Sequence, residues 1–421
     1  MKRRQTGAVI LTVALTMLFL LGFMGIALDF GHLFVVKTEL QTATDSCALA
    51  AAQELDGASD ALTRATSAGR TAGNLNKTNF QGGTAGLAAA DITFSDSLIG
   101  AYSSTFAPVA NARYARCVRT RGGMAPWMLQ AMSAFSGNAA YGANRAVFAQ
   151  AVATRASAQS TCPLPISIKP KAGGVAPNYG FQVGEWVVLL SKDNVTPGKI
   201  GWFPLNSGGK MEDIENQLNG TYCGVKANDN VGTEVSGVKA SLFEIWNYRF
   251  GIYKNKADPS VDRPDYSGYA YTTDNWKPRA GGAMPNAYSG STPPGSHATA
   301  ANFKTKRLAF ASYDDTGTDI KHGDKITGLK MNSFKELATP NPGGQHDQLG
   351  YNRRIVLVPV TPFGSTKVVD FVCMLMLRPI EDPNADVELE FLGNAGAVNS
   401  PCTTYGMAGG TAGPLVPTLV Q

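Results

Sequence analysis

The sequence predicts an α+β protein: a single N-terminal transmembrane helix that continues into a stalk helix, then a small α/β module and a larger β-rich region. Three features carry this prediction: an uncharged N-terminal run, an apolar stripe with helical spacing behind it, and short β-type segments that dominate after residue 160. We divide the 421 residues into a cytoplasmic tip with the transmembrane anchor, an N-terminal module and a β-rich C-terminal region, at 1–28, 29–160 and 161–421. This length allows one large or two ordinary domains.

The anchor is the uncharged, mostly apolar run 7–28, which follows basic residues at positions 2 to 4 and ends before Asp29. As a helix it would be roughly 33 Å long, enough to cross a hydrocarbon core of about 30 Å. The positive-inside rule keeps the basic tip in the cytoplasm, so we expect the rest of the chain on the other side. The alternative is a signal peptide cleaved near Ala27, although the apolar core of such peptides is usually shorter.

An apolar stripe follows the anchor. Apolar residues recur there at helical spacing, at Val36, Leu40, Ala43, Cys47, Ala50 and Leu55. No proline occurs before Pro108, so we expect the membrane helix to continue through this stripe as a stalk of about 73 Å from residue 7 to residue 55. Either the module itself covers the stripe, or a second copy or another subunit does so in an oligomer.

The cysteines indicate an oxidising compartment. Their number is even, they are widely spaced and they form no C-x-x-C motif, which argues against a zinc or redox centre and favours disulfides: Cys47, Cys117, Cys162, Cys223, Cys373 and Cys402. The sequence does not choose the pairing, and Cys47 remains a candidate for a free thiol.

Segments rich in branched and aromatic residues predict strands at 91–94, 112–119, 146–153, 186–190, 355–360, 368–377 and 387–392. The run 368–377 is almost continuously apolar, which is typical of a buried central strand. In 387–392 charged and apolar residues alternate, so Glu388 and Glu390 are expected to face water. Residues 124–135 predict an apolar helix that either packs into the core or touches membrane or a partner, and 280–300 predicts a surface loop.

Three N-terminal segments point to a family: Arg4-Gln-Thr-Gly-Ala-Val, Gly25-Ile-Ala-Leu-Asp-Phe-Gly-His-Leu, and the run from Lys37 to Gly57. They resemble the N-terminal module of TadE/TadG-like proteins of tight-adherence (Tad, or Flp-type) pilus assembly. The resemblance extends over about 4–155, and the tract from Arg353 and the stretch 393–413 look similar to C-terminal parts of TadG-like proteins.

The resemblance implies a non-catalytic structural or scaffold component, anchored in a bacterial inner membrane with its bulk in the periplasm. Its implied partners are other Tad/Flp pilus-assembly proteins, and its implied roles are adherence and biofilm formation. Minor-pilin members carry a glutamate five residues after a cleaved glycine, but the fifth residue after Gly7 is Thr12. Cleavage by a prepilin peptidase is therefore not expected.

No catalytic, cofactor or metal residue is predicted. Asp314, Thr316 and Thr318 imitate the Asp-x-Ser-x-Ser metal motif of larger TadG proteins, but a polar turn is favoured because that domain needs further ligand loops. Asp315-Thr-Gly resembles an aspartic-protease loop without a second copy. The histidines His32, His297, His322 and His346 lack metal-ligand spacing. The net charge of +5 forms no basic stripe, so nucleic acid is not an expected partner.

The tract 243–276 is dense in aromatic residues mixed with arginine and lysine. Such residues are typical of interface hot spots, and we consider these candidates for partner contact: Trp246, Tyr253, Tyr266, Tyr269, Tyr271 and Trp276. The alternative is that they pack the β-rich core. A glycan-binding surface adhesin and a periplasmic hydrolase with an unrecognised site remain alternative functions.

Overall fold

The three-dimensional structure is a computed structural model that describes residues 6–220, 222–235, 240–254, 258–268, 270–271, 276, 286–290, 302–305, 319–320, 324–325, 334–336, 348–380 and 384–421. The chain forms two compact units: unit 1 comprises Met1–Arg155 and Pro417–Gln421, and unit 2 comprises Ala156–Val416. Helices and sheets are both present, so the predicted α+β class is confirmed. The chain passes from one unit to the other after Arg155 rather than after residue 160, and its C-terminal end returns to unit 1.

Helix α1 (Thr6–Gln53) is one unbroken helix of 48 residues, about 72 Å long at 1.5 Å per residue. The predicted continuation of the anchor into a stalk is therefore confirmed. The part Val9–Gln53 is long and apolar enough to cross a membrane by length and composition. The large apolar side chains described between Val9 and Phe30 are exposed, whereas the stripe that begins at Val36 is buried.

Helix α2 (Ala61–Leu75) packs along the second half of α1. The close approach depends on glycine: a Cβ at Gly73 would overlap Leu87 Cδ1 and lie 3.1 Å from the carbonyl oxygen of Ala43. The predicted stripe is buried there, except for half-buried Ala50. The module itself therefore covers the stripe, which is the first of the two expected alternatives.

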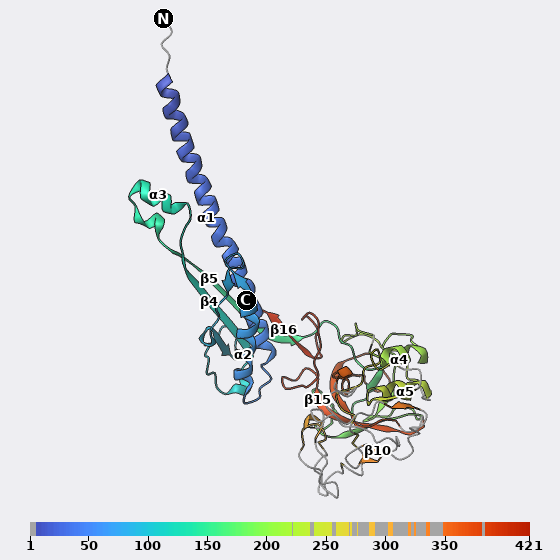
Figure 1. The fold of residues 1–421 in the computed structure, drawn as a ribbon. Coiled ribbons are helices and arrows are strands. Elements are labelled where there is room, and N and C mark those ends of the chain that lie inside the picture. The colour runs from blue at the N-terminus through green and yellow to red at the C-terminus, as the bar shows by residue number, and fades with distance from the viewer. Residues whose placement is uncertain are drawn as a thin grey trace. The chain divides into compact units, whose positions relative to one another are not determined.

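The sheet of unit 1 has the order β16-β5-β4-β3. Its strands are β3 (Ile92–Ser95), β4 (Tyr114–Met124), β5 (Arg145–Ser157) and β16 (Leu415–Leu419). Strands β4 and β5 form a long antiparallel hairpin, with α3 (Leu129–Ser136) and the short helix η3 (Ala139–Gly142) in its tip. In Figure 1 this hairpin runs beside α1 and brings α3 next to it. The predicted helix at 124–135 thus begins later, because Met124 belongs to β4.

Smaller elements complete unit 1. They are the ladder of β1 (Lys77–Thr78) with β2 (Gly83–Thr84), and the short helices η1 (Ala89–Asp91) and η2 (Val109–Asn111).

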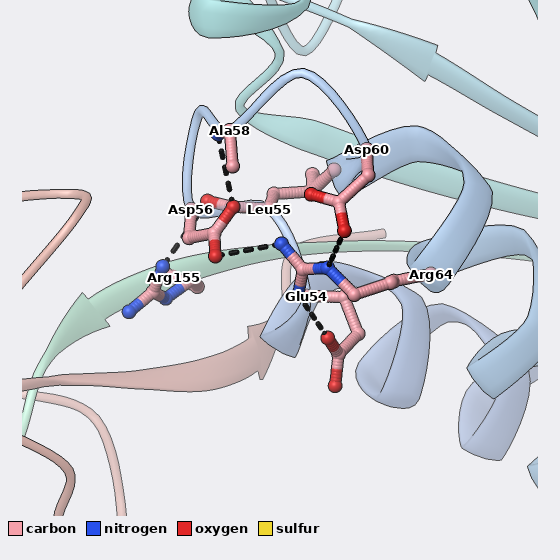
Figure 2. A network of polar contacts seen from close by, with 7 residues as sticks. All are labelled: Glu54, Leu55, Asp56, Ala58, Asp60, Arg64 and Arg155. Carbon is pink, nitrogen blue, oxygen red and sulfur yellow. Dashed lines mark hydrogen bonds and ion pairs between the residues drawn. The ribbon is translucent and has the colours of Figure 1, made fainter. Parts of the chain in front are cut away.

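A polar network holds the turn between α1 and α2 (Figure 2). Arg64 of α2 donates to Glu54 Oε2 at 2.5 Å, to Asp56 Oδ2 at 2.7 Å and to Asp60 Oδ2 at 3.1 Å. Burial opposes the charge, but these hydrogen bonds outweigh it and raise the pKa of the Arg64 guanidinium above its ordinary value. Arg155 of β5 donates to the Leu55 carbonyl at 3.1 Å. The end of α1 is therefore tied both to α2 and to the sheet.

Unit 2 is built around a closed barrel of order β13-β14-β15-β7-β8-β6. Its strands are β6 (Ile166–Ile168), β7 (Trp186–Leu189), β8 (Ile200–Trp202), β13 (Ile355–Val360), β14 (Asp370–Met376) and β15 (Val387–Asn394). The four strands predicted in this region correspond to β7, β13, β14 and β15. Every residue of β14 is buried, as its continuous apolar character predicts.

Two helices and two short ladders accompany the barrel. The helices are α4 (Met211–Leu218) and α5 (Ala240–Tyr248). The ladders pair β9 (Ile252–Lys254) with β12 (Phe334–Glu336), and β10 (Asp319–Ile320) with β11 (Asp324–Lys325).

All six cysteines form disulfides: Cys47–Cys117, Cys162–Cys223 and Cys373–Cys402. The predicted use of the cysteines is confirmed, and the suggestion of a free thiol at Cys47 is wrong. Cys47 and Cys117 meet because α1 crosses β4 in the core of unit 1. Each bond lies within one unit.

One strand prediction is wrong in detail. Glu390 of β15 is fully buried instead of facing water. Its carboxylate accepts hydrogen bonds from the backbone N–H groups of Ala287 (2.6 Å) and Tyr288 (3.0 Å) and from the indole of Trp186 (3.2 Å). These donors come from segments distant in sequence, so alternation along the strand could not reveal them. Glu388 is half-buried and pairs with Arg378 at 3.3 Å.

Candidate membrane-proximal site

The first part of α1 exposes a continuous apolar surface. Its large side chains are exposed by 41% to 71%: Val9, Ile10, Leu11, Val13, Leu15, Met17, Phe19, Leu20, Phe23, Met24, Ile26 and Leu28. A soluble protein seldom exposes so much contiguous apolar surface, because each apolar group in water costs free energy. This face therefore requires lipid or another protein around it.

Asp29 ends the apolar run, and its carboxylate is turned into the protein. It is only 4% exposed and accepts hydrogen bonds from the backbone N–H groups of Trp127 (2.7 Å), Met128 (3.1 Å) and Leu129 (2.7 Å). Met128, at the N-cap of α3, makes no side-chain cap of its own. A residue of α1 thus caps α3, with its negative charge at the positive end of the helix dipole.

Two glycines of α1 allow α3 to approach. A Cβ at Gly25 would lie 2.7 Å from Met128 Cβ, closer than side chains tolerate, and one at Gly22 would touch Met132 Sδ at 3.8 Å. Since Met128 meets Gly25 and Met132 meets Gly22, α3 runs along α1 toward its N-terminus. The hairpin tip therefore lies at the level of the predicted membrane span.

His32, one turn after Asp29, lies in an aromatic stack. Its ring packs 4.4 Å from that of Trp127 and 5.3 Å from that of Phe80, and its Nε2 lies 2.8 Å from Asn79 Oδ1. Asn79, Phe80 and Gln81 all have positive φ, a conformation that costs a non-glycine residue roughly 1 kcal/mol or more. Contacts to α1 hold this strained turn, including the Phe80 N–H donated to Glu39 at 3.3 Å.

Two cavities adjoin this cluster. One of about 130 Å³ is lined by residues that include Asp29, Leu33, Leu129 and Arg145. Another, of about 470 Å³, borders His32 and Trp127. The cluster of Asp29, His32, Phe80 and Trp127 is the candidate site. Its geometry is that of a structural junction between α1, the β1–β2 turn and the hairpin tip.

The aromatic candidates for partner contact do not gather on a surface. Trp246, Tyr253, Tyr271 and Trp276 are buried by 98% or more in unit 2. Trp246 packs edge-on against Trp202, and Tyr271 against Trp276. For these four the alternative of core packing is correct, and their assignment to partner contact is corrected. Tyr266 is half-buried, and Tyr269 lies outside the described residues.

Tyr266 borders a cavity of about 470 Å³ in unit 2, together with the buried Arg249 and with Arg353. Arg249 donates to the carbonyls of Arg353 (2.6 Å) and Leu218 (2.7 Å). Burial and the positive charge of Arg353 hold the pKa of Arg249 well below its ordinary value, although Asp265 opposes them. The guanidinium joins separate backbone segments and gives the cavity a basic wall.

The remaining chemical candidates fall outside the described residues: Asp314, Thr316, Thr318, His297, His322, His346 and most of the 280–300 loop. Within the described part of the chain, no group of three His, Cys, Asp or Glu residues is arranged to hold a metal ion. The junction of His32 with Asp29 and Trp127 was not predicted from the sequence. The glycines at 22 and 25 were the available signal, because they mark a face of the helix that admits close packing.

The fold and this site define a protein with one N-terminal helix long and apolar enough to cross a membrane, joined to a disulfide-bonded module. Residues 7–54 match the family model described as "Putative Flp pilus-assembly TadE/G-like". The resemblance drawn from the N-terminal sequence is thereby confirmed for that segment. No curated protein and no solved structure gives a significant match to the chain.

Proposed function

We propose that this protein is a single-pass, inner-membrane-anchored structural or scaffold component of a Tad (Flp-type) pilus-assembly apparatus, and that it acts through protein contacts without catalysis. One observation carries the proposal: the family match covers α1 from its exposed apolar face to Cys47, the residue that joins it to the module. The matched segment is thus both anchor and stalk. Its partners are other Tad/Flp pilus-assembly proteins, and its bulk faces the periplasm, where it serves adherence and biofilm formation.

Three features support retention of the anchor and its orientation. Cleavage near Ala27 would remove Gly22 and Gly25, against which α3 packs. The basic residues at positions 2 to 4 favour a cytoplasmic N-terminus. The disulfides of both units suit an oxidising periplasm.

Reporter fusions test the orientation. Alkaline phosphatase fused after Gln421 should be active, and a green fluorescent protein fused at the same position should not fluoresce. The reverse result would contradict the orientation.

A deletion strain tests the role in assembly. Loss of the chain should abolish or sharply reduce surface pili in electron micrographs, and the full chain should restore them. A matched variant in which residues 1–28 are replaced by a cleavable signal peptide should fold but fail to restore pili, because it is not held in the membrane. Normal piliation in the deletion strain would disprove the role, and full rescue by the released variant would disprove the need for the anchor.

Cross-linking in intact cells tests the partners. A photoreactive residue in place of Phe34, which is 68% exposed on the stalk, should capture other pilus-assembly proteins. The same residue at Ile99, also exposed on unit 1, is the matched control for random collision. Identical products from both positions would contradict a specific contact through the stalk. Turnover of ester or peptide probes by the full chain in nanodiscs would contradict the non-catalytic role.

A further inference from the structure

We infer that the tip of the β4–β5 hairpin, including α3, lies in the outer interface of the lipid bilayer and forms a second membrane contact of this chain. The partner is the boundary between lipid headgroups and acyl chains. The inference rests on the part of the proposed function that places α1 across the membrane, and it adds a separate, monotopic contact to the spanning helix.

Position is the first argument. Helix α3 contacts α1 between Gly22 and Asp29, which is the C-terminal end of the uncharged run 7–28. Seven residues of helix cover about 10 Å, so α3 stands beside the last roughly 10 Å of a span that fills a hydrocarbon core of about 30 Å. A hairpin tip held at that level by packing and by the Asp29 cap cannot avoid the bilayer that surrounds α1.

Composition is the second argument. From Met124 to Asn144 the tip contains no charged residue, and Arg121 and Arg145 stand at its two ends. Trp127 is 57% exposed and Tyr141 is 38% exposed. Tryptophan and tyrosine are enriched at the level of lipid headgroups, because each ring is apolar with a polar edge. Arg145 is exposed at the base of the tip, where it is placed to meet the phosphates of those headgroups.

Polar satisfaction is the third argument. A helix that enters a bilayer must satisfy its first N–H groups within the protein, since the hydrocarbon offers no acceptors. Asp29 accepts from Trp127, Met128 and Leu129, so the first N–H group of α3 and the two that precede it have an acceptor within the protein. The same bonds satisfy a carboxylate that would otherwise be costly near lipid. The contact between Asp29 and the start of α3 therefore leaves the polar groups of both helices hydrogen-bonded at the level of the lipid interface.

Trp127 provides a direct test with the full chain in vesicles of phosphatidylethanolamine and phosphatidylglycerol that carry brominated acyl chains. Bromine quenches tryptophan only on contact. The chain has four other tryptophans, of which Trp202, Trp246 and Trp276 are buried in unit 2 and Trp186 is half-buried there. Bromine near the headgroup end should quench wild-type emission, and Trp127→Phe should abolish most of that quenching. Trp186→Phe is the matched control and should retain it.

A second variant guards against a folding defect. On the Trp127→Phe background, Tyr141→Trp places a new indole in η3 of the same tip and should restore quenching. Equal quenching in wild type and Trp127→Phe, in protein that floats with the vesicles after an alkaline wash, would overturn the inference. Protein that does not float would instead show that α1 is not inserted, which is failure of the proposed anchoring.

Discussion

The two units of this protein reach a folded state with different kinds of core. The core of unit 1 is built mainly from alanine, with a few larger residues such as Leu40, Ile92 and Phe94. The core of unit 2 contains tryptophans, phenylalanines and branched residues on all sides of its barrel. Alanine buries little apolar area, so burial contributes less free energy per residue in unit 1. Its stability must therefore be concentrated in close helix packing and in one disulfide, with a smaller contribution from the Arg64 network.

Unit 2 differs because it has a core of large side chains, and this core also contains buried ionisable groups. Arg354 is fully buried, and its guanidinium donates to the carbonyls of Met376, Ser267 and Leu377 at 2.9 to 3.1 Å. Glu390 is buried with three N–H donors. Unit 1 should therefore be sensitive to the loss of single structural features and unit 2 to pH.

The largest effect is expected from the disulfide of unit 1. Replacing Cys47 and Cys117 together by alanine should lower the free energy of unfolding of unit 1 by about 4 kcal/mol, from the loop-entropy relation for a large loop. Amide hydrogen exchange followed by mass spectrometry, with peptides from each unit, would report this. Replacing Cys162 and Cys223 is the matched control and should increase exchange in unit 2 instead. Unchanged exchange in α1 and β4 would contradict the comparison.

Next in size is the pH dependence of unit 2. Burial raises the pKa of Glu390 from 4.5 to about 7, against hydrogen bonds from Tyr288, Ala287 and Trp186 that lower it. Between these values the folded protein holds a proton that the unfolded chain has lost, so the free energy of unfolding falls as pH rises through this window, by on the order of 3 kcal/mol.

Chemical denaturation between pH 4.5 and 7 measures this fall. Glu390→Gln should abolish it because the amide does not titrate, while Glu388→Gln, on the same strand, should retain it. Stability of unit 2 that is constant or rises over this window in the wild type would contradict the assignment.

A smaller effect is expected from the helix contact of unit 1. Gly73→Ala should destabilise it by about 1–3 kcal/mol, since the new methyl group overlaps Leu87 Cδ1 and lies tightly against the carbonyl oxygen of Ala43, which forces the helices apart. Gly122→Ala is the control, because a Cβ there meets nothing within 4 Å. Equal denaturation midpoints for the two variants would show that close packing of α1 and α2 is not a main support.

The smallest effect is expected from the network in Figure 2. Arg64→Met retains most of the apolar stem and removes the ion pairs with Glu54, Asp56 and Asp60. Partly exposed ion pairs contribute little, so the loss should be about 0.5–1 kcal/mol and should shrink in high salt. A loss that does not change with salt would show that Arg64 acts through packing instead.

Much of the fold could be predicted because it depends on local patterns. The continuous α1, the four main barrel strands and the use of cysteines in disulfides follow from uncharged length, apolar runs and even cysteine number. Contacts between distant segments could not be predicted in this way. Asp29 as the cap of α3, the pairing of Cys47 with Cys117, and the burial of Glu390 each depend on a partner far away in sequence.

Functional residues were equally hard to predict from local patterns. Aromatic density at 243–276 suggested a binding surface, but composition is equally compatible with a core, and Trp246 and Tyr271 are core residues. The junction around His32 draws on residues near positions 30, 80 and 127, so no local window contains it.

The apolar span, the helical stripe and the alternation of the strands are specified locally, because each depends on the order of neighbouring side chains relative to water or lipid. The faces that these elements present to one another are specified only in the folded chain. In the folded chain the apolar stripe packs against α2, the side chain of Glu390 is buried and α3 lies beside the apolar span. These contacts join groups that are distant in sequence, and they contribute free energy only once folding has brought the groups together.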